Sequence, residues 1–142
     1  MTHRSHVTGC AIALMVLSAA SLRGPLAAQQ PRADTPETVM VTLHAKPGGE
    51  ADLARVIARH WETARRLNLV LDAPHVTLRG TEDGDKTYFV HVFTWRDAGI
   101  PDAAPAAIQA IWMEMNRFVE SRGGRPGLQF TEVSIVAPET GR

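Results

Sequence analysis

The chain has a single cysteine, no net charge and no long apolar run after its first thirty residues. Its 142 residues carry 15 Lys and Arg against 15 Asp and Glu. A neutral chain lacks the basic surface that displaces counterions from nucleic acid, so we expect no nucleic-acid partner. With Cys10 near the N-terminus as the only cysteine, the body of the chain has no disulfide, thiolate nucleophile or cysteine metal ligand. We also expect that body not to span a membrane.

The first 28 residues have the three-part pattern of a secretory signal peptide. Residues 1–10 carry one Arg and no acid, residues 11–22 are apolar, and small residues end at Ala28. We therefore predict cleavage after Ala28, loss of Cys10, and export to the periplasm or the medium. The pattern then divides the rest into a polar linker (29–37), a folded domain (38–137) and a short C-terminal tail (138–142).

Hydrophobic periodicity predicts the order strand, helix, strand, strand, helix, strand. The strands are expected at residues 38–45, 75–79, 88–95 and 128–136, and the helices at residues 50–68 and 105–120. An Asp-Gly turn pattern within residues 80–87 makes the two middle strands a hairpin. This order predicts an α+β, ferredoxin-like fold, in which a four-stranded antiparallel sheet carries both helices on one face.

The strand at residues 88–95 is apolar on both faces. Its two alternating sets are Phe89, His91, Phe93 and Trp95, and Tyr88, Val90, Val92 and Thr94. The helices cover only one face of the sheet, so something else has to cover the other. We expect a second copy of the same sheet, which gives a two-fold homodimer.

Four histidines lie beyond residue 28 and are candidates for acid–base chemistry: His44, His60, His75 and His91. His91 lies in mid-strand between two phenylalanines, where a buried imidazole suits either a general base or a structural hydrogen bond. His44 approaches the first half of the third strand if the first and third strands face alike. His60 lies on the inner stripe of its helix. No pair has the spacing of a metal-binding motif, so we expect no metal site.

Two segments resemble the dimeric α/β-barrel superfamily, most closely its antibiotic biosynthesis monooxygenase-like branch. They are Val-Thr-Leu-His-Ala-Lys-Pro-Gly at 41–48 and Val-Phe-Thr-Trp-Arg-Asp at 92–97, and the six-element order matches over about residues 38–136. In haem-degrading relatives a tryptophan in the place of Trp95 packs on the cofactor. The asparagine of those relatives falls here on Val41, and the helix at 105–120 lacks their histidine. We therefore expect no cofactor.

The resemblance implies cofactor-free oxygenase chemistry, in which a phenolic substrate loses its proton and the anion reacts directly with oxygen. His91 or His44 is then the expected base, and Arg79 the expected group that steadies the anion. The expected ligand-binding residues are Trp61, Trp95, Trp112, Phe93, Met115 and His60.

Three hypotheses about function stay open. The first is an exported dimeric protein with a small-molecule pocket, within which cofactor-free monooxygenation of phenolic or other hydrophobic substrates is the leading activity. The second is a module that binds a hydrophobic molecule without turning it over. The third is a structural or interaction protein whose barrel is filled by its own side chains, with every buried histidine paired internally.

Overall fold

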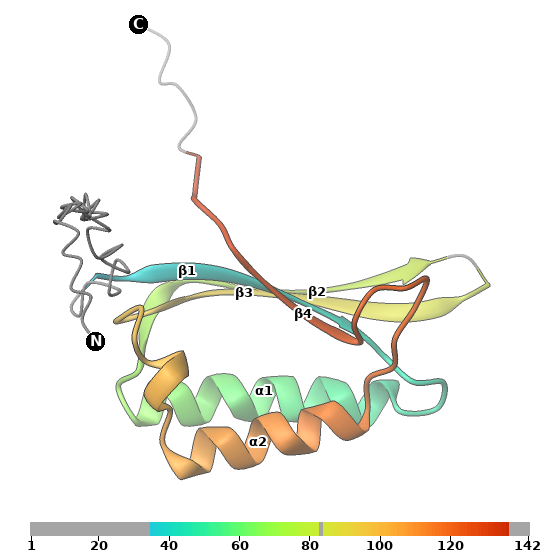
Figure 1. Cartoon of the computed structure of the whole chain (residues 1–142), viewed down its shortest axis with the longest axis horizontal. Coiled ribbons are helices and arrows are strands. Elements are labelled where there is room, and N and C mark those ends of the chain that lie inside the picture. The colour runs from blue at the N-terminus through green and yellow to red at the C-terminus, as the bar shows by residue number, and fades with distance from the viewer. Residues whose placement is uncertain (1–34, 83, 137–142) are drawn as a thin grey trace, which may run out of the picture.

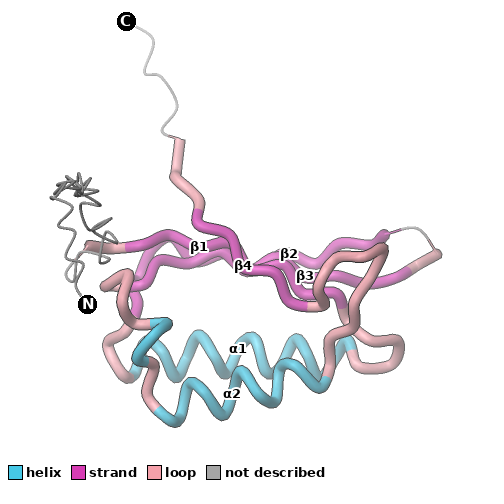
Figure 2. Tube along the Cα trace, in the orientation of Figure 1, coloured by secondary structure: helices cyan, strands magenta, loops and turns pink. Residues whose placement is uncertain are grey.

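The computed structural model describes residues 35–82 and 84–136, which form one antiparallel sheet and two α-helices. The sheet order is β2-β3-β1-β4, and both helices lie against the same face (Figure 1, Figure 2). The elements are β1 (Glu37–His44), α1 (Glu50–Arg66), β2 (Val70–Glu82), β3 (Lys86–Trp95), a short 3-10 helix η1 (Pro101–Ala103), α2 (Ala106–Arg117) and β4 (Leu128–Glu132). The predicted ferredoxin-like fold is confirmed. The predicted signal peptide, residues 29–34 of the predicted linker and the whole predicted tail (138–142) lie outside the described residues.

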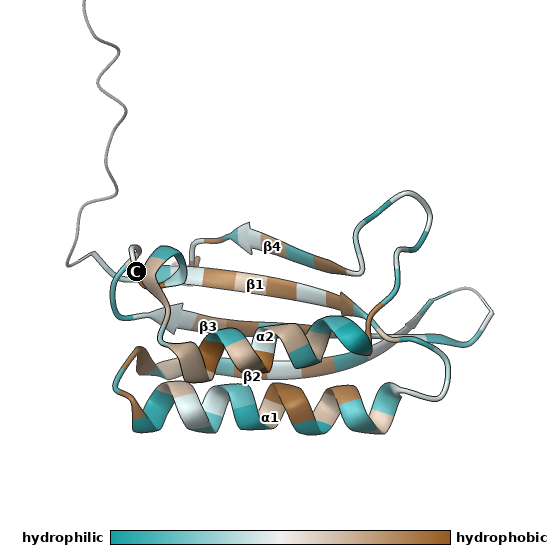
Figure 3. Cartoon of the chain, turned by 60° about the horizontal axis from the view of Figure 1, so that its bottom comes forward, coloured by the Kyte–Doolittle hydropathy of each residue, from teal (hydrophilic) through white to brown (hydrophobic). Residues whose placement is uncertain are grey.

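The core forms between the sheet and one stripe of each helix. In α1 the buried positions recur at helical spacing from Leu53 to Ala64, and acids begin the helix while Arg65 and Arg66 end it, as the helix dipole favours. In α2 the buried stripe is Ile108, Ile111 and Met115. Figure 3 shows the matching apolar stretch along β1. In the described ranges no helix is long and apolar enough to cross a membrane.

Strand register decides which side chains of β3 face the helices. His91 pairs with Val41 of β1 and with Thr77 of β2, and paired residues point to the same face of a sheet. Val41 and His91 are both buried in the core layer. The set Phe89, His91, Phe93 and Trp95 therefore faces the helices.

The opposite face of the sheet carries an apolar strip. Val76 and Leu78 of β2 are 43% and 56% exposed, and they pair with Val92 and Val90 of β3. Neither helix covers this face. The second copy expected to cover it stays a prediction.

Several element boundaries differ from the sequence-based expectation, most of all in β2, α2 and β4. β4 ends at Glu132 rather than at residue 136. β2 begins at Val70 rather than His75, with a register shift between these residues; Asp72 and Pro74 are turn-forming types, which conceals the strand in the sequence. α2 ends at Arg117 rather than near Glu120. The chain leaves the helix there because the backbone of Phe118 and Glu120 hydrogen-bonds to Lys46 and His44 at the end of β1.

Candidate functional site

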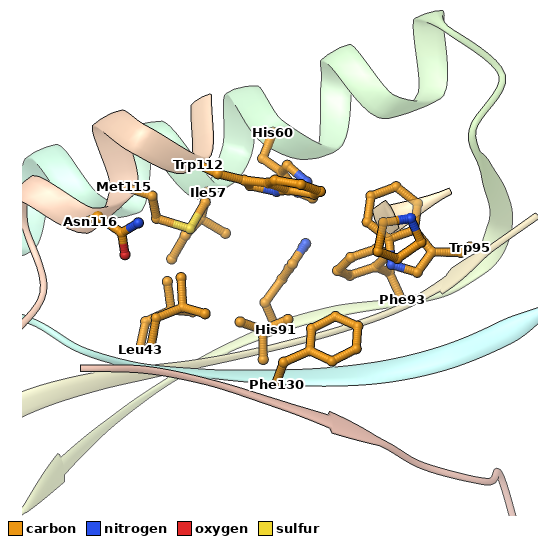
Figure 4. Close-up of a pocket in the computed structure, with 13 residues that line it drawn as sticks. Leu43, Ile57, His60, His91, Phe93, Trp95, Trp112, Met115, Asn116 and Phe130 are labelled. Atoms are coloured by element: carbon orange, nitrogen blue, oxygen red, sulfur yellow. The ribbon is translucent and has the colours of Figure 1, made fainter. Parts of the chain in front are cut away.

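A cavity of about 330 Å³ lies between the helix-facing side of the sheet and the helices. Its size falls in the range of small-molecule sites, and its wall is mainly apolar, as such sites usually are. Figure 4 shows the side chains that converge on it from both layers. They are Val41, Leu43, Ile57, His60, His91, Phe93, Trp95, Pro101, Trp112, Met115, Asn116, Leu128 and Phe130.

Six of the residues expected from the sequence to bind a ligand or act on it line this cavity: His60, His91, Phe93, Trp95, Trp112 and Met115. Trp61 does not line it. Its ring stacks flat on that of His75, with 3.8 Å between centroids, and lies 6.5 Å from the ring of His91. Trp61 therefore packs on His75 near His91 rather than in the cavity wall.

His91 rises from β3 towards the helices (Figure 4). Its Nδ1 lies 2.8 Å from the hydroxyl oxygen of Thr77, while its Nε2 is buried with no hydrogen-bond partner in the described part of the chain. Burial, with smaller contributions from His60 and His75, lowers the pKa of His91 to about 3. The ring is therefore neutral at pH 7, so one of its nitrogens carries a proton and can donate, and the other has a lone pair and can accept.

His60 of α1 lies across the cavity from the sheet. A hydrogen bond from Trp112 of α2 determines which nitrogen of the His60 ring carries the proton. The indole nitrogen of Trp112 donates to Nε2 of His60 over 3.2 Å. Burial lowers the pKa of His60 to about 4, so this ring is also neutral at pH 7. Because indole only donates, Nε2 of His60 has to accept, and the proton of His60 is on Nδ1.

Three residues that line the cavity each have one buried nitrogen with no hydrogen-bond partner in the part of the chain that the structure describes. These atoms are Nδ1 of His60, Nε2 of His91 and Nε1 of Trp95. A buried polar group left unpaired costs about 1–3 kcal/mol. The nitrogens of His60 and Trp95 are donors, so oxygen atoms of a bound molecule are the groups that would satisfy them.

His75 lies between the cavity residues and solvent. Its ring is 5.3 Å from that of His91, and partial burial, together with the charge of Arg65, lowers the pKa of His75. Arg65 itself lies over the Trp61 ring, 5.9 Å from its centroid.

Within the described ranges, no three His, Cys, Asp or Glu side chains lie close enough together to hold a metal ion.

The structure does not bring His44 or Arg79 to the cavity. His44 pairs with Tyr88 in the first half of β3, but on the opposite face of the sheet from His91. The condition that the two strands face alike is therefore not met for His44 and His91. Its Nδ1 donates to the Pro126 carbonyl over 3.1 Å. Arg79 is on the helix-facing side but nearer the β2–β3 hairpin, where its guanidinium donates to the Thr87 hydroxyl.

Sequence reasoning missed Thr77, the hydrogen-bond partner of His91, and Asn116, the amide on the cavity wall. Thr77 follows from strand alternation only once the pairing of β2 with β3 is known, and one residue of slip would place it on the other face. Asn116 comes one position after buried Met115 in the last turn of α2 and is itself exposed. Its place at the cavity depends on where the helix ends, which the sequence does not show.

Solved structures with the same architecture are similar to this chain over most of its length. A variant of SnoaB, a cofactor-independent oxygenase from Streptomyces nogalater, is 15% identical with a TM-score of 0.54, covering 75% of this chain and 98% of that one. Rv0793 from Mycobacterium tuberculosis is 9% identical with a TM-score of 0.52, covering 75% of this chain and 100% of that one. An antibiotic biosynthesis monooxygenase is 14% identical with a TM-score of 0.51, covering 72% and 100%.

The chain has the fold of the antibiotic biosynthesis monooxygenase-like proteins. The resemblance expected from residues 41–48 and 92–97 is confirmed at this level. No protein-family model matches the sequence, and no curated protein matches it. At these identities the likeness establishes the fold, and the activity has to be argued from the cavity.

Proposed function

We propose that this chain is an exported protein that binds a hydrophobic molecule carrying an acidic hydroxyl group, such as a phenol, and promotes its reaction with oxygen without a cofactor. The observation that carries the proposal is His91, a buried neutral imidazole with Nε2 unpartnered at an apolar cavity. A neutral imidazole nitrogen accepts a proton from a hydroxyl group that reaches it.

The other cavity groups suit the anion that such a proton transfer leaves behind. The indole N–H of Trp95 is an unpartnered donor on the same strand as His91, and donors held in place in a dry site stabilise developing negative charge. The aromatic and aliphatic wall suits a flat ring system. A phenolate is electron-rich, so its reaction with oxygen needs an ionised, positioned substrate more than further catalytic groups.

The comparison with SnoaB supports this proposal without carrying it. That protein is a cofactor-independent oxygenase, and the fold it shares with this chain supplies the same sheet-and-helix frame around a cavity. One fold hosts many chemistries, so the proposed activity of this chain rests on its own histidines.

We also propose that the protein works as a homodimer. Apolar side chains on the open face of the sheet, including Val76 and Leu78, are supported by further partly buried valines on β3. A sheet from a second copy covers such a face most simply. The cavity is on the helix side, so this association leaves it intact.

Export is the remaining part of the proposal and is supported by the apolar run and small residues that precede Gln29. N-terminal sequencing of protein recovered from the periplasm or medium tests it. We expect the chain to begin at Gln29. Protein that stays in the cytoplasm with Met1 intact would contradict export.

Oxygen uptake with a panel of phenols and naphthols tests the activity. The His91→Phe variant fills the same space without a proton acceptor, and we expect it to lose roughly 100-fold or more of the wild-type rate. The control is His75→Gln, which alters a histidine outside the cavity and should retain uptake. Equal rates in wild type and His91→Phe would contradict the role of His91.

A non-catalytic binding function is the second candidate, and the low pKa of His91 favours it. A base whose conjugate acid has a pKa of about 3 takes a full proton from a phenol with difficulty. Saturable binding of the phenols with no oxygen uptake from any of them would select this function. The filled-barrel hypothesis fits less well, because a cavity is present and buried histidines keep unpaired nitrogens.

A further inference from the structure

We propose that Thr77 is a positioning residue whose hydroxyl oxygen accepts a hydrogen bond from Nδ1–H of His91 and passes the proton of the bound ligand from the cavity to solvent. This inference rests on the proposed function, because it supplies the proton path that ionisation of a buried hydroxyl group needs. Nothing in the sequence pattern singles out Thr77. Its assignment comes from the pairing of β2 with β3 and from one hydrogen bond.

The geometry connects the cavity to solvent through two side chains. Among the described residues, Nε2 of His91 is buried at the cavity wall without a partner. On the other side of the ring, Nδ1 lies 2.8 Å from the Thr77 hydroxyl oxygen. Thr77 is an exposed residue of the sheet-edge strand β2, so the residue that contacts the imidazole also borders solvent. Thr77 is on the helix-facing side of the sheet, so a second sheet stacked on the opposite face would not cover it.

A relay through Thr77 removes the obstacle of the weakly basic ring. Burial makes a charged imidazole costly, and neither His60 nor His75, the titratable groups that act on His91, stabilises it. In the relay His91 never carries a charge. The ligand O–H gives its proton to Nε2 while the Nδ1 proton moves to the Thr77 oxygen and the Thr77 proton moves to water.

The proton balance of this step is complete. One O–H bond of the ligand breaks and one bond forms in hydronium, while His91 changes from the Nδ1–H to the Nε2–H tautomer and Thr77 regains its hydroxyl proton. The product is a ligand anion whose oxygen accepts a hydrogen bond from the new Nε2–H. The hydroxyl group of threonine suits this task because it both donates and accepts. The starting tautomer returns when the anionic product takes the Nε2 proton while a proton passes back from water through Thr77 to Nδ1, so His91 stays neutral throughout.

The test uses 1-naphthol, a photoacid whose fluorescence distinguishes its neutral form from its anion. Excitation makes the hydroxyl group of bound 1-naphthol strongly acidic. Emission from the anion therefore shows that the protein has accepted the naphthol proton during the lifetime of the excited state. We expect wild-type protein to bind 1-naphthol saturably and to give anion emission. In Thr77→Val, which keeps the β-branched shape and loses the hydroxyl, the ratio of anion to neutral emission should fall roughly tenfold or more, with similar affinity.

Two controls separate the relay from a change in packing. Thr77→Ser restores a hydroxyl group and should restore anion emission. Thr81→Val makes the same substitution on the same face of β2, paired with Thr87 rather than His91, and should behave as wild type. Unchanged anion emission in Thr77→Val, or neutral emission from wild type, would overturn the relay alone. Absence of saturable binding in wild type would overturn the proposed function and the relay with it.

A second measurement needs no ligand. Side-chain ¹⁵N resonances of histidine-labelled protein show which ring nitrogen carries the proton. We expect His91 of the wild type to be the Nδ1–H tautomer, with Thr77 accepting, and Thr77→Val to shift it towards Nε2–H while Thr81→Val leaves it unchanged. Identical His91 tautomers in wild type and Thr77→Val would contradict the positioning role.

Discussion

The indole nitrogen of Trp112 lies 3.2 Å from Nε2 of His60, and this hydrogen bond joins α2 to α1 above the cavity. It makes His60 an Nδ1–H donor. Below the cavity, the hydroxyl oxygen of Thr77 in β2 lies 2.8 Å from Nδ1 of His91. The two neutral histidines, 6.0 Å apart between ring centroids, thus each have one nitrogen engaged and the other unpaired.

The tautomer of His60 should depend on Trp112. Trp112→Phe removes the donor, so Nε2 of His60 loses its partner, and we expect a mixed tautomer together with a loss of about 1–2 kcal/mol in the free energy of unfolding. Side-chain ¹⁵N resonances and urea titration measure these effects. Trp61→Phe is the control, since it should leave His60 as Nδ1–H. A pure Nδ1–H form in Trp112→Phe would contradict the assignment.

Stability should fall as the pH is lowered from 7 to 5. The pKa values of His60 and His91 are lowered from 6.5 to about 4 and about 3, so in this window the unfolded chain binds protons that the folded chain does not. The loss is about 2 kcal/mol for each of these histidines. Urea titrations at both pH values measure it, and His91→Leu should lose about half of the dependence. A free energy of unfolding that is constant or larger at pH 5 would contradict the buried neutral pair.

The open face of the sheet should control association. Leu78→Lys places a charge on the apolar strip, and we expect it to convert the dimer into a monomer in light-scattering measurements, because burying an unpaired charge is costly. Met113→Lys is the matched control, since Met113 is 64% exposed on α2, away from that face. A monomeric wild type, or a dimer that Leu78→Lys leaves intact, would contradict the proposed dimer.

Arg122 and Arg125 should differ sharply although both contact Glu82. The Arg122 side chain is 8% exposed and also donates to the Ala45 and Thr87 carbonyls, whereas that of Arg125 is 55% exposed. We expect Arg122→Met to cost about 3 kcal/mol in the free energy of unfolding, and Arg125→Met less than about 1 kcal/mol. Equal losses in chemical denaturation would show that burial does not decide the contribution here.

Local pattern predicted the fold and six of the thirteen residues that line the cavity, while strand register decided much of the rest. Alternation in β3 places His91 and Trp95 on one face whatever the pairing, and helical spacing gives the stripe that includes His60. That Val41 rather than His44 meets His91 depends on the pairing of β1 with β3, and a one-residue slip reverses such an outcome. Thr77 and Asn116 depend likewise on pairing and on a helix end, which short-range patterns do not determine.

A crystal structure of the protein soaked with 1-naphthol would show where the hydroxyl group of a bound phenol lies. We expect the rings in the cavity between β3 and α2, with the hydroxyl oxygen within hydrogen-bond distance of Nε2 of His91. An empty cavity at saturating ligand, or naphthol bound away from His91, would contradict it.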